Sequence, residues 1–441
     1  MFRNNTITFR TGWVDREASD RAASFASALD FIHKRLGQQL YRVCESITED
    51  MIDRTAMEFP QCVTMLHLIC GPNPPITVRD FLFQDRRNWR LPPSTHRKII
   101  QFILSLGKGT KKWWEFWKDD EVLGQKHGDP DIVSLLTRIP DPWIILDEDD
   151  IASLREQCQS WNKTIYVPGQ DRHPMKRYFS AAALAIQFLG RLDSNVLSAI
   201  RHIELDEVHA SVAYPECHGL GLVSIMQQYP GISISRRVDT RSNTITGKFN
   251  QQYIEDLVDW YLDEQSYDYH GRLRRVHVSQ AFMRWFEEAV ALSSYMPPDR
   301  FSVTFHPKDA ESTLAILEQV IEDSIWQSVV EQLATRPSNP LNLMDSCCFF
   351  PESFTRVTRE IQRGEGNVRF DIGNLHVPDD EVKQIHVDQD REPYEVGSHW
   401  IETFVWTYIE ASPFSSWEDM LQEYMEDGLH NEWLHRWRGS V

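Results

Sequence analysis

Short apolar segments alternate with amphipathic helices in the middle of the chain, and this pattern restricts the fold more than any other feature of the sequence. Runs of apolar and β-branched residues predict strands, and apolar residues at helical spacing predict helices between them. The expected strands are "WIIL" (143–146), "TIYV" (164–167), "RHIEL" (201–205) and "ISISRRV" (232–238), and the expected helices are "IASLREQC" and "FSAAALAIQFLGRL". These strand-helix units, over about residues 143–238, predict α/β alternation. The strands are irregularly spaced, so no solenoid repeat is indicated.

Helix-rich segments flank this middle region on both sides. Residues 1–128 are predicted to be mainly helical, residues 129–250 form the strand-helix region, and residues 251–441 are predicted to be helix-rich with interleaved strands such as "FSVTF". The predicted fold class is α+β, with the three regions either separate or joined in one compact unit. Apolar stripes at helical spacing support the outer helices: Ile99, Ile100, Ile103 and Leu104; Phe282, Trp285, Phe286, Ala289 and Val290; Leu317, Ile321, Ile325, Val329 and Leu333.

The chain is strongly acidic. Its 441 residues carry a formal net charge of -19, from 65 acidic and 46 basic side chains. This charge repels a phosphate backbone, so we expect no nucleic-acid partner and no binding to anionic membranes. Protein partners are expected instead, with basic or neutral surfaces favoured by the overall charge.

The first residues and the cysteines bear on the compartment. "MFRNNTITFRTGWVDREASD" has charged and polar residues where a signal peptide needs an apolar core, and no run approaches the roughly 18 apolar residues of a membrane helix. The seven cysteines are scattered, without a Cys-x-x-Cys pair, which indicates reduced thiols and no disulfide framework. We therefore expect a cytoplasmic or nuclear protein.

The segment "ECHGLGLVSIMQQYPGISI" (216–234) raises the question of an active site, because it places a cysteine, a histidine and two glycines close together. As a dinucleotide-binding loop it has Gly219 and Gly221, but Ser224 occupies the third glycine position. The preceding expected strand also ends more than ten residues before Gly219. A dinucleotide loop needs its glycines directly in the strand-to-helix turn, so this spacing argues against one.

Two other chemical interpretations use the same neighbourhood. A zinc site could draw on His202, His209, Cys217 and His218, with Glu204, Asp206 and Glu207 nearby. However, adjacent residues of a helix point roughly 100° apart, which opposes joint ligation by Cys217 and His218. Alternatively, Cys217 could be a nucleophile at a helix start, assisted by His209 or His218, but no third partner is evident.

The interpretation that remains for this segment is structural. Pro215 and Glu216 would begin a helix, and the two glycines would permit close packing at its entrance. We therefore assign no catalytic, cofactor-binding or metal-ligating residue, and we expect no cofactor.

Two resemblances accompany these observations. The order "FSAAALAIQFLGRL", "IRHIELDE" and "SVAYPECHGLGLVSIMQQYPGISISRRVD", over about residues 179–240, resembles a group of uncharacterised proteins of filamentous fungi. The segment "LPPSTHRKIIQFI" resembles F-box-like fungal modules through Leu91, Pro92, Pro93 and Ile99, with Ser94 in place of the family's acidic residue. This second resemblance implies a substrate adaptor of a ubiquitin ligase. The alternative is a helix that simply begins at a proline.

A tryptophan-rich stretch supplies the other candidate interaction residues. In "GKGTKKWWEFWKDDE" the aromatic residues Trp113, Trp114 and Trp117 either form an exposed partner-binding patch or anchor a loop to the core. The function expected from the sequence is a non-enzymatic protein-interaction module. The alternatives are an F-box-like adaptor, or a cysteine- or metal-dependent enzyme around residues 202–218.

Overall fold

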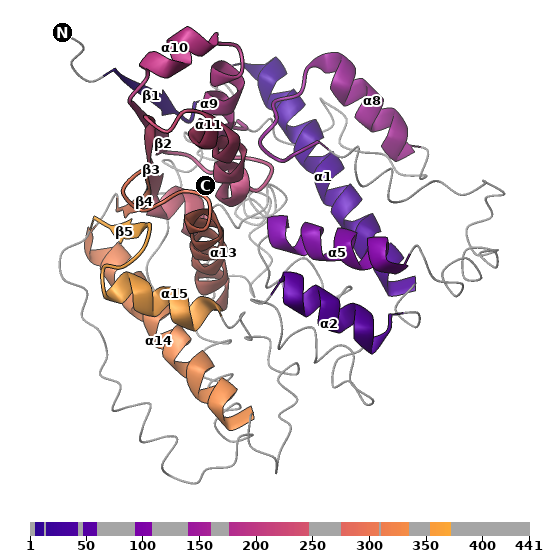
Figure 1. Ribbon diagram of the computed structural model, residues 1–441, viewed down its shortest axis with the longest axis vertical. Coiled ribbons are helices and arrows are strands. Elements are labelled where there is room, and N and C mark those ends of the chain that lie inside the picture. The colour runs from indigo at the N-terminus through magenta and orange to yellow at the C-terminus, as the bar shows by residue number, and fades with distance from the viewer. Residues whose placement is uncertain are drawn as a thin grey trace, which may run out of the picture.

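A computed structural model describes residues 5–12, 15–42, 47–59, 93–107, 140–159, 176–246, 275–307, 310–334 and 353–371. These residues form helices and a parallel β-sheet of five strands (Figure 1). The mixed α and β fold predicted from the sequence is confirmed. No helix in these ranges is both long and apolar enough to cross a bilayer.

The five strands of the sheet are all parallel and stand side by side in the order in which they occur in the chain. They are β1 (Thr6–Arg10), β2 (His202–Glu207), β3 (Ser233–Asp239), β4 (Phe301–His306) and β5 (Val368–Phe370). Strands β2, β3 and β4 confirm three of the expected strands. All three sequence regions thus contribute strands to one sheet.

Strands added in one direction place their connections on one face of the sheet, because parallel crossovers are almost always right-handed. From α9 onward, the described helices between the strands are α9 (Ala181–Leu189), α10 (Ser194–Ala199), η4 (Pro215–Leu222), α11 (Val223–Gln228), the π-helix η5 (Arg241–Thr246), α13 (Arg275–Ser293), α14 (Ala310–Ala334) and α15 (Ser353–Gln362). Figure 1 shows α9, α11 and α13 to the same side of the strands. We call this side the covered face.

The covered face carries the apolar side chains of the sheet. It presents Ile203, Leu205, Ile234, Val238, Phe301, Val303, Phe305 and Val368, all buried. Phe305 is the centre of an aromatic cluster: its ring stacks on Phe370 with centroids 5.3 Å apart and meets Phe286 edge-on at 5.7 Å. The expected stripe residues Phe282 and Trp285 contact the same ring from α13.

Four helices precede the main part of the sheet in sequence: α1 (Arg16–Arg42), α2 (Glu49–Glu58), α5 (Pro93–Gly107) and α8 (Glu148–Gln159). Helix α5 packs on α1 and α2, and α8 packs on α1. The stripe from Ile99 to Leu104 is fully buried, as its helical spacing predicted. The backbone N–H of Arg177, which precedes α9, donates to the Ser19 hydroxyl of α1 at 2.8 Å, so α1 is joined to the chain beside the sheet.

One strand prediction is wrong. Residues 143–146 form a turn and an extended lead into α8, with no strand partner among the described residues. The backbone N–H of Ile144 donates to the Asp141 carbonyl at 3.0 Å, closing a turn, and the Ile144 side chain is exposed. In this run Trp143 packs beside Gly221 and Leu146 is buried, without a place in the sheet. The expected strand "TIYV" lies outside the described residues.

The segment that opens with Pro215 is a helix entrance, as its sequence suggested. It forms the 3-10 helix η4, which leads directly into α11. The two residues that precede η4, Ala213 and Tyr214, have left-handed backbone conformations, with φ of 64° and 62°. Gly221 fits here because a Cβ would lie 2.5 Å from both Trp143 Cδ1 and Ile186 Cδ1. The glycine therefore permits the close approach of η4 to α9 and to the turn at Trp143.

We expect Gly221→Ala to lower the free energy of unfolding by about 1–3 kcal/mol, because the new methyl group overpacks against two ordered side chains. Gly231→Ala is the matched control, since its Cβ would meet nothing closer than 3.7 Å. The control should leave stability within about 0.5 kcal/mol or raise it slightly. Urea unfolding followed by tryptophan fluorescence measures both, and equal stability of the two variants would contradict the packing assignment.

Candidate functional site

The face of the sheet opposite the helices carries polar side chains and is the candidate functional site. We call it the open face. Strand pairing aligns its residues in rows across the sheet: Thr6, His202 and Ser233; Thr8, Glu204, Ser235 and Ser302; and Arg10, Asp206, Arg237, Thr304 and Arg369. All of these side chains are exposed or partly exposed. Parallel sheets are usually covered on both faces by apolar contacts, so a polar face on this sheet is notable.

The third row, which we call the arginine row, spans all five strands. It consists of Arg10, Asp206, Arg237, Thr304 and Arg369. Asp206 is the one acid in this row. Its carboxylate lies 3.6 Å from Arg10 Nε and 3.9 Å from Nε2 of His306, the last residue of β4. Arg237 and Arg369 are exposed.

Hydrogen bonds between side chains order the adjoining rows. The two ring nitrogens of His202 are 2.8 Å from Ser233 Oγ and 2.9 Å from Ser235 Oγ. Thr8 Oγ1 donates to a carboxylate oxygen of Glu204 at 3.0 Å. These short side chains are held across neighbouring strands, so the open face is a preorganised polar surface.

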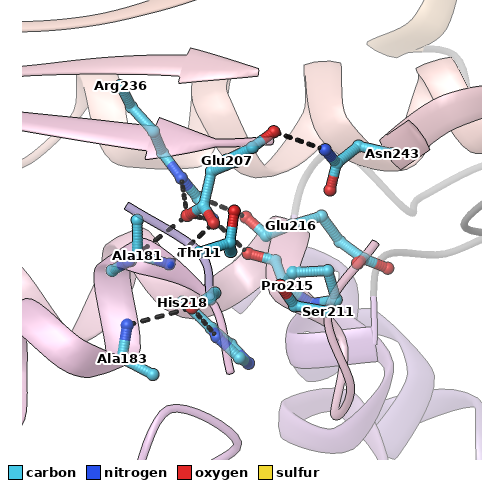
Figure 2. Close-up of polar contacts among 12 residues, drawn as sticks. Thr11, Ala181, Ala183, Glu207, Ser211, Pro215, Glu216, His218, Arg236 and Asn243 are labelled. Carbon is cyan, nitrogen blue, oxygen red and sulfur yellow. Dashed lines mark hydrogen bonds and ion pairs between the residues drawn. The ribbon is translucent and has the colours of Figure 1, made fainter. Parts of the chain in front are cut away.

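A buried ion pair supports this surface from the opposite face. Glu207 ends β2 and Arg236 lies in β3, and both side chains point into the covered face with 0% and 1% exposure. Arg236 Nη2 donates to Glu207 Oε1 at 2.7 Å, and Nε donates to the same oxygen at 3.0 Å (Figure 2). A buried ion pair persists only when further hydrogen bonds satisfy both groups.

The Glu207 carboxylate receives those bonds from the first residues of α9. The backbone N–H groups of Ala181 and Ala182 donate to it at 2.7 and 3.3 Å. Negative charge is favourable at a helix N-terminus because unpaired N–H groups point there. The Glu207 backbone carbonyl accepts from Asn243 Nδ2 at 2.7 Å (Figure 2). Glu207 thereby connects β2, β3, α9 and the segment after β3.

The guanidinium of Arg236 connects to η4 and α13. Its Nη2 donates to the Pro215 carbonyl at 2.7 Å, and its Nη1 donates to the Glu216 carbonyl at 3.4 Å. The group also lies over the Trp285 ring, 4.6 Å from the centroid, a favourable cation–π arrangement. Arg236 is therefore a structural residue, whereas its neighbour Arg237 belongs to the open face.

His218 is a buried structural histidine. Its Nδ1 lies 2.6 Å from Ser180 Oγ, the N-cap of α9, and its Nε2 lies 2.7 Å from the Ala213 carbonyl. Burial lowers the pKa of His218 to about 3, so the ring is neutral at physiological pH. Both ring nitrogens are engaged, and the ring fixes the left-handed turn at Ala213 against α9.

The environment of Cys217 opposes a nucleophilic role. The side chain is completely buried, and its thiol donates to the Tyr214 carbonyl with Sγ and O 3.1 Å apart. Burial raises the pKa of Cys217 well above its ordinary value, and the nearby carboxyl groups of Glu288 and Glu216 raise it further. A nucleophilic cysteine requires the opposite shift, toward the thiolate.

The histidines singled out around residues 202–218 do not converge on one site. His202 lies on the open face, His209 stacks on Tyr178 with ring centroids 4.4 Å apart, and His218 is buried beside α9. Within the described ranges, no group of three or more His, Cys, Asp and Glu side chains is placed to hold a metal ion.

Of the candidate interaction residues predicted from the sequence, the structure describes Ile99. Ile99 is fully buried in α5, where it contributes to the helical core. Leu91, Pro92, Trp113, Trp114 and Trp117 lie outside the described residues, so their roles stay predictions. The open face was not identified from the sequence, although the alternation in "ISISRRVD" places Arg236 with Ile234 and Arg237 with Ser235.

The chain was compared with known proteins. It matches no protein-family model, no curated protein and no solved structure.

Three carboxyl groups lie buried on η4 and α13. They belong to Glu216, Glu287 and Glu288. The Ser94 hydroxyl, at the start of α5, donates to Glu288 Oε1. Burial raises the pKa of Glu288 to about 7 and that of Glu287 to about 8, and repulsion between the carboxylates contributes to both shifts. The folded protein thus keeps protons there that the unfolded chain would release.

Arg236→Met should lower the free energy of unfolding by about 3–5 kcal/mol, because it leaves the Glu207 carboxylate buried without its cation. Arg237→Met is the matched control on the same strand, since its side chain is exposed, and it should change stability by no more than about 0.5 kcal/mol. Chemical unfolding measures both variants. Adding Glu207→Gln to Arg236→Met should recover part of the loss, and a purely additive double variant would contradict a direct pair.

Glu288→Gln tests the buried carboxyl groups through pH. Because the folded pKa is raised to about 7 from 4.5, stability present below pH 4.5 is lost as the pH rises through about 7. The glutamine variant cannot lose a proton, so its stability should fall less over this interval, by about 3 kcal/mol. Unfolding curves at pH 4.5 and pH 8 measure the difference. Glu148→Gln, on an exposed helix start, is the control and should follow the unsubstituted protein.

Proposed function

We propose that this chain is a non-enzymatic protein-interaction module of the cytoplasm or nucleus, and that the open face is its contact surface. The observation that carries the proposal is the one-sided construction of the sheet. All the apolar side chains of the strands point to the covered face, while the opposite face offers ordered polar and charged side chains over five strands. A rigid polar surface of this width suits recognition of another macromolecule.

The chemistry of the remaining candidates supports binding over catalysis. Cys217 and His218 are buried and committed to backbone and hydroxyl partners, and their pKa shifts oppose thiolate and imidazolium forms. Enzyme sites place titratable groups together in an accessible cleft. On the open face, His202 is fixed between Ser233 and Ser235, and Glu204 Oε1 lies 3.8 Å from its Nε2, so both ring nitrogens are engaged by hydroxyls of the neighbouring strand.

As a second candidate we propose a substrate adaptor of a ubiquitin ligase. The favouring observation is that α5 begins at Pro93, directly after Leu91 and Pro92, and packs on α1 and α2. A helical unit would then bind the ligase, while the sheet would select the substrate. This candidate rests on the F-box-like resemblance of "LPPSTHRKIIQFI".

Site-specific photocrosslinking tests both candidates with the full-length protein. A benzoylphenylalanine at Thr6 or Thr304, on the open face, should crosslink one recurrent partner in cells, whereas the same group at exposed Ser293 of α13 should not. Partner adducts equally abundant at Ser293, or absent at both open-face positions, would contradict the proposed contact surface. Recovery of a cullin and its adaptor with the tagged protein, lost on Leu91→Ala with Pro92→Ala, would favour the second candidate.

A further inference from the structure

The arginine row has a charge pattern opposite to that of the whole chain. The protein carries a formal net charge of -19, yet this row holds three arginines, on β1, β3 and β5, and one aspartate. Asp206 stands between Arg10 and Arg237 in the row, and its carboxylate lies 3.6 Å from Arg10 Nε, so its ion pair is with the arginine on β1. Arg237 and Arg369 are exposed, and neither has an ion pair or hydrogen bond from its side chain to another described residue.

The spacing of these arginines follows from the sheet. Parallel strands are about 4.8 Å apart, so arginines on alternate strands stand about 10 Å apart along the row. Thr304 is the one residue of the row between Arg237 and Arg369, and its side chain is shorter and uncharged. A segment in the extended polyproline II conformation rises about 3.1 Å per residue and has three residues per turn, so its side chains at positions i and i+3 point the same way and are about 9 Å apart.

We propose that the arginine row binds an extended acidic segment of a partner protein, with carboxylates three residues apart on Arg237 and Arg369. This inference rests on the proposed function, since it names the chemistry of the partner at the open face. The segment would lie across the strands, with its backbone over the serine and threonine hydroxyls of the second row. Guanidinium groups suit carboxylates because they donate two parallel hydrogen bonds.

The overall negative charge does not prevent this contact. Charges are screened over about 8–10 Å at physiological ionic strength, so a carboxylate beside Arg237 is influenced mainly by its nearest neighbours. The same charge does oppose a long polyanion, whose many phosphates would approach Glu204, Asp206 and the rest of the acidic surface. Spaced carboxylates on a short protein segment therefore fit the row better than a nucleic acid.

The test uses the full-length protein and a fluorescein-labelled nine-residue peptide with glutamate at every third position, separated by serine and threonine. Fluorescence anisotropy at low and physiological salt measures its affinity, and a glutamine version of the peptide is the ligand control. We expect the glutamate peptide to bind and the glutamine peptide to bind about tenfold more weakly, because two charged pairs are lost.

Matched variants locate the contact. Arg237→Gln with Arg369→Gln should weaken binding of the glutamate peptide about tenfold. Arg54→Gln with Arg191→Gln removes the same charge from exposed sites on α2 and beside α9, and it should leave the affinity within about twofold. Both pairs are exposed, and urea unfolding confirms that each variant is folded. Equal weakening in the two double variants, or no binding to the unsubstituted protein, would overturn the inference.

Two further outcomes separate this inference from the proposed function. Open-face crosslinks at Thr6 and Thr304 without binding of the acidic peptide would overturn the acidic segment and leave the interaction surface standing. Absence of both would remove the proposed function with it. A single-stranded decanucleotide that binds as tightly as the peptide, with the same dependence on Arg237 and Arg369, would overturn the choice of a protein segment.

Discussion

The direction in which the strands are added governs the rest of this structure. Each new parallel strand pairs with the one before it, from β1 to β5, and the sheet never grows back toward its first edge. Because right-handed crossovers then return on one side, the helices bury one face and leave the other to polar side chains. The apolar positions of the strands and the polar open face are thus two consequences of one topological choice.

The buried ion pair of Glu207 and Arg236 connects the sheet to α9, η4 and α13, which the order of the strands does not do by itself. One carboxylate reaches the start of α9, and one guanidinium reaches η4 and Trp285. Glu207 directly follows Asp206 in β2, and Arg236 directly precedes Arg237 in β3. Because the buried pair holds β2 against β3, it also fixes the separation of Asp206 and Arg237 on the open face. Contacts on the covered face thus determine the spacing of charges on the open face.

The sequence predicted the parts of the fold whose signals are local. Strands β2, β3 and β4 alternate apolar and polar residues, apart from Glu207 and Arg236, and α5 has a clear stripe, so both types were found. "WIIL" was misassigned because an apolar run shows burial without showing whether a neighbouring strand exists. Strand β5 has only three residues, too few for a periodic signal. Strand β1, "TITFR", does alternate, but it is short and far from its partner in sequence.

The site was predictable only in part, for a related reason. The interpretation of the glycine-rich segment as a helix entrance depends on nearby residues, and it was confirmed. The arginine row exists only because certain strands are neighbours in a certain register. Its five residues are far apart in the sequence, so the sequence alone shows neither the strand order nor the register. Alternation in "ISISRRVD" does place Arg236 and Arg237 on opposite faces. Arg236 is a charged residue at a strand position where the alternation predicts an apolar one. That departure was the sequence signal for its buried ion pair with Glu207.

The distance along the chain between β1 and β2 has a consequence for how the protein is made. Thr8 of β1 finds its partner Glu204 196 residues later. At about 5–20 residues per second, the ribosome needs roughly 10–40 seconds to produce that partner after the first strand has emerged. Until then none of the described strands offers β1 an edge on which to form its ladder. Strand β1 therefore joins the sheet only after β2 has been made, and the described helices between β1 and β2 must form without that pairing.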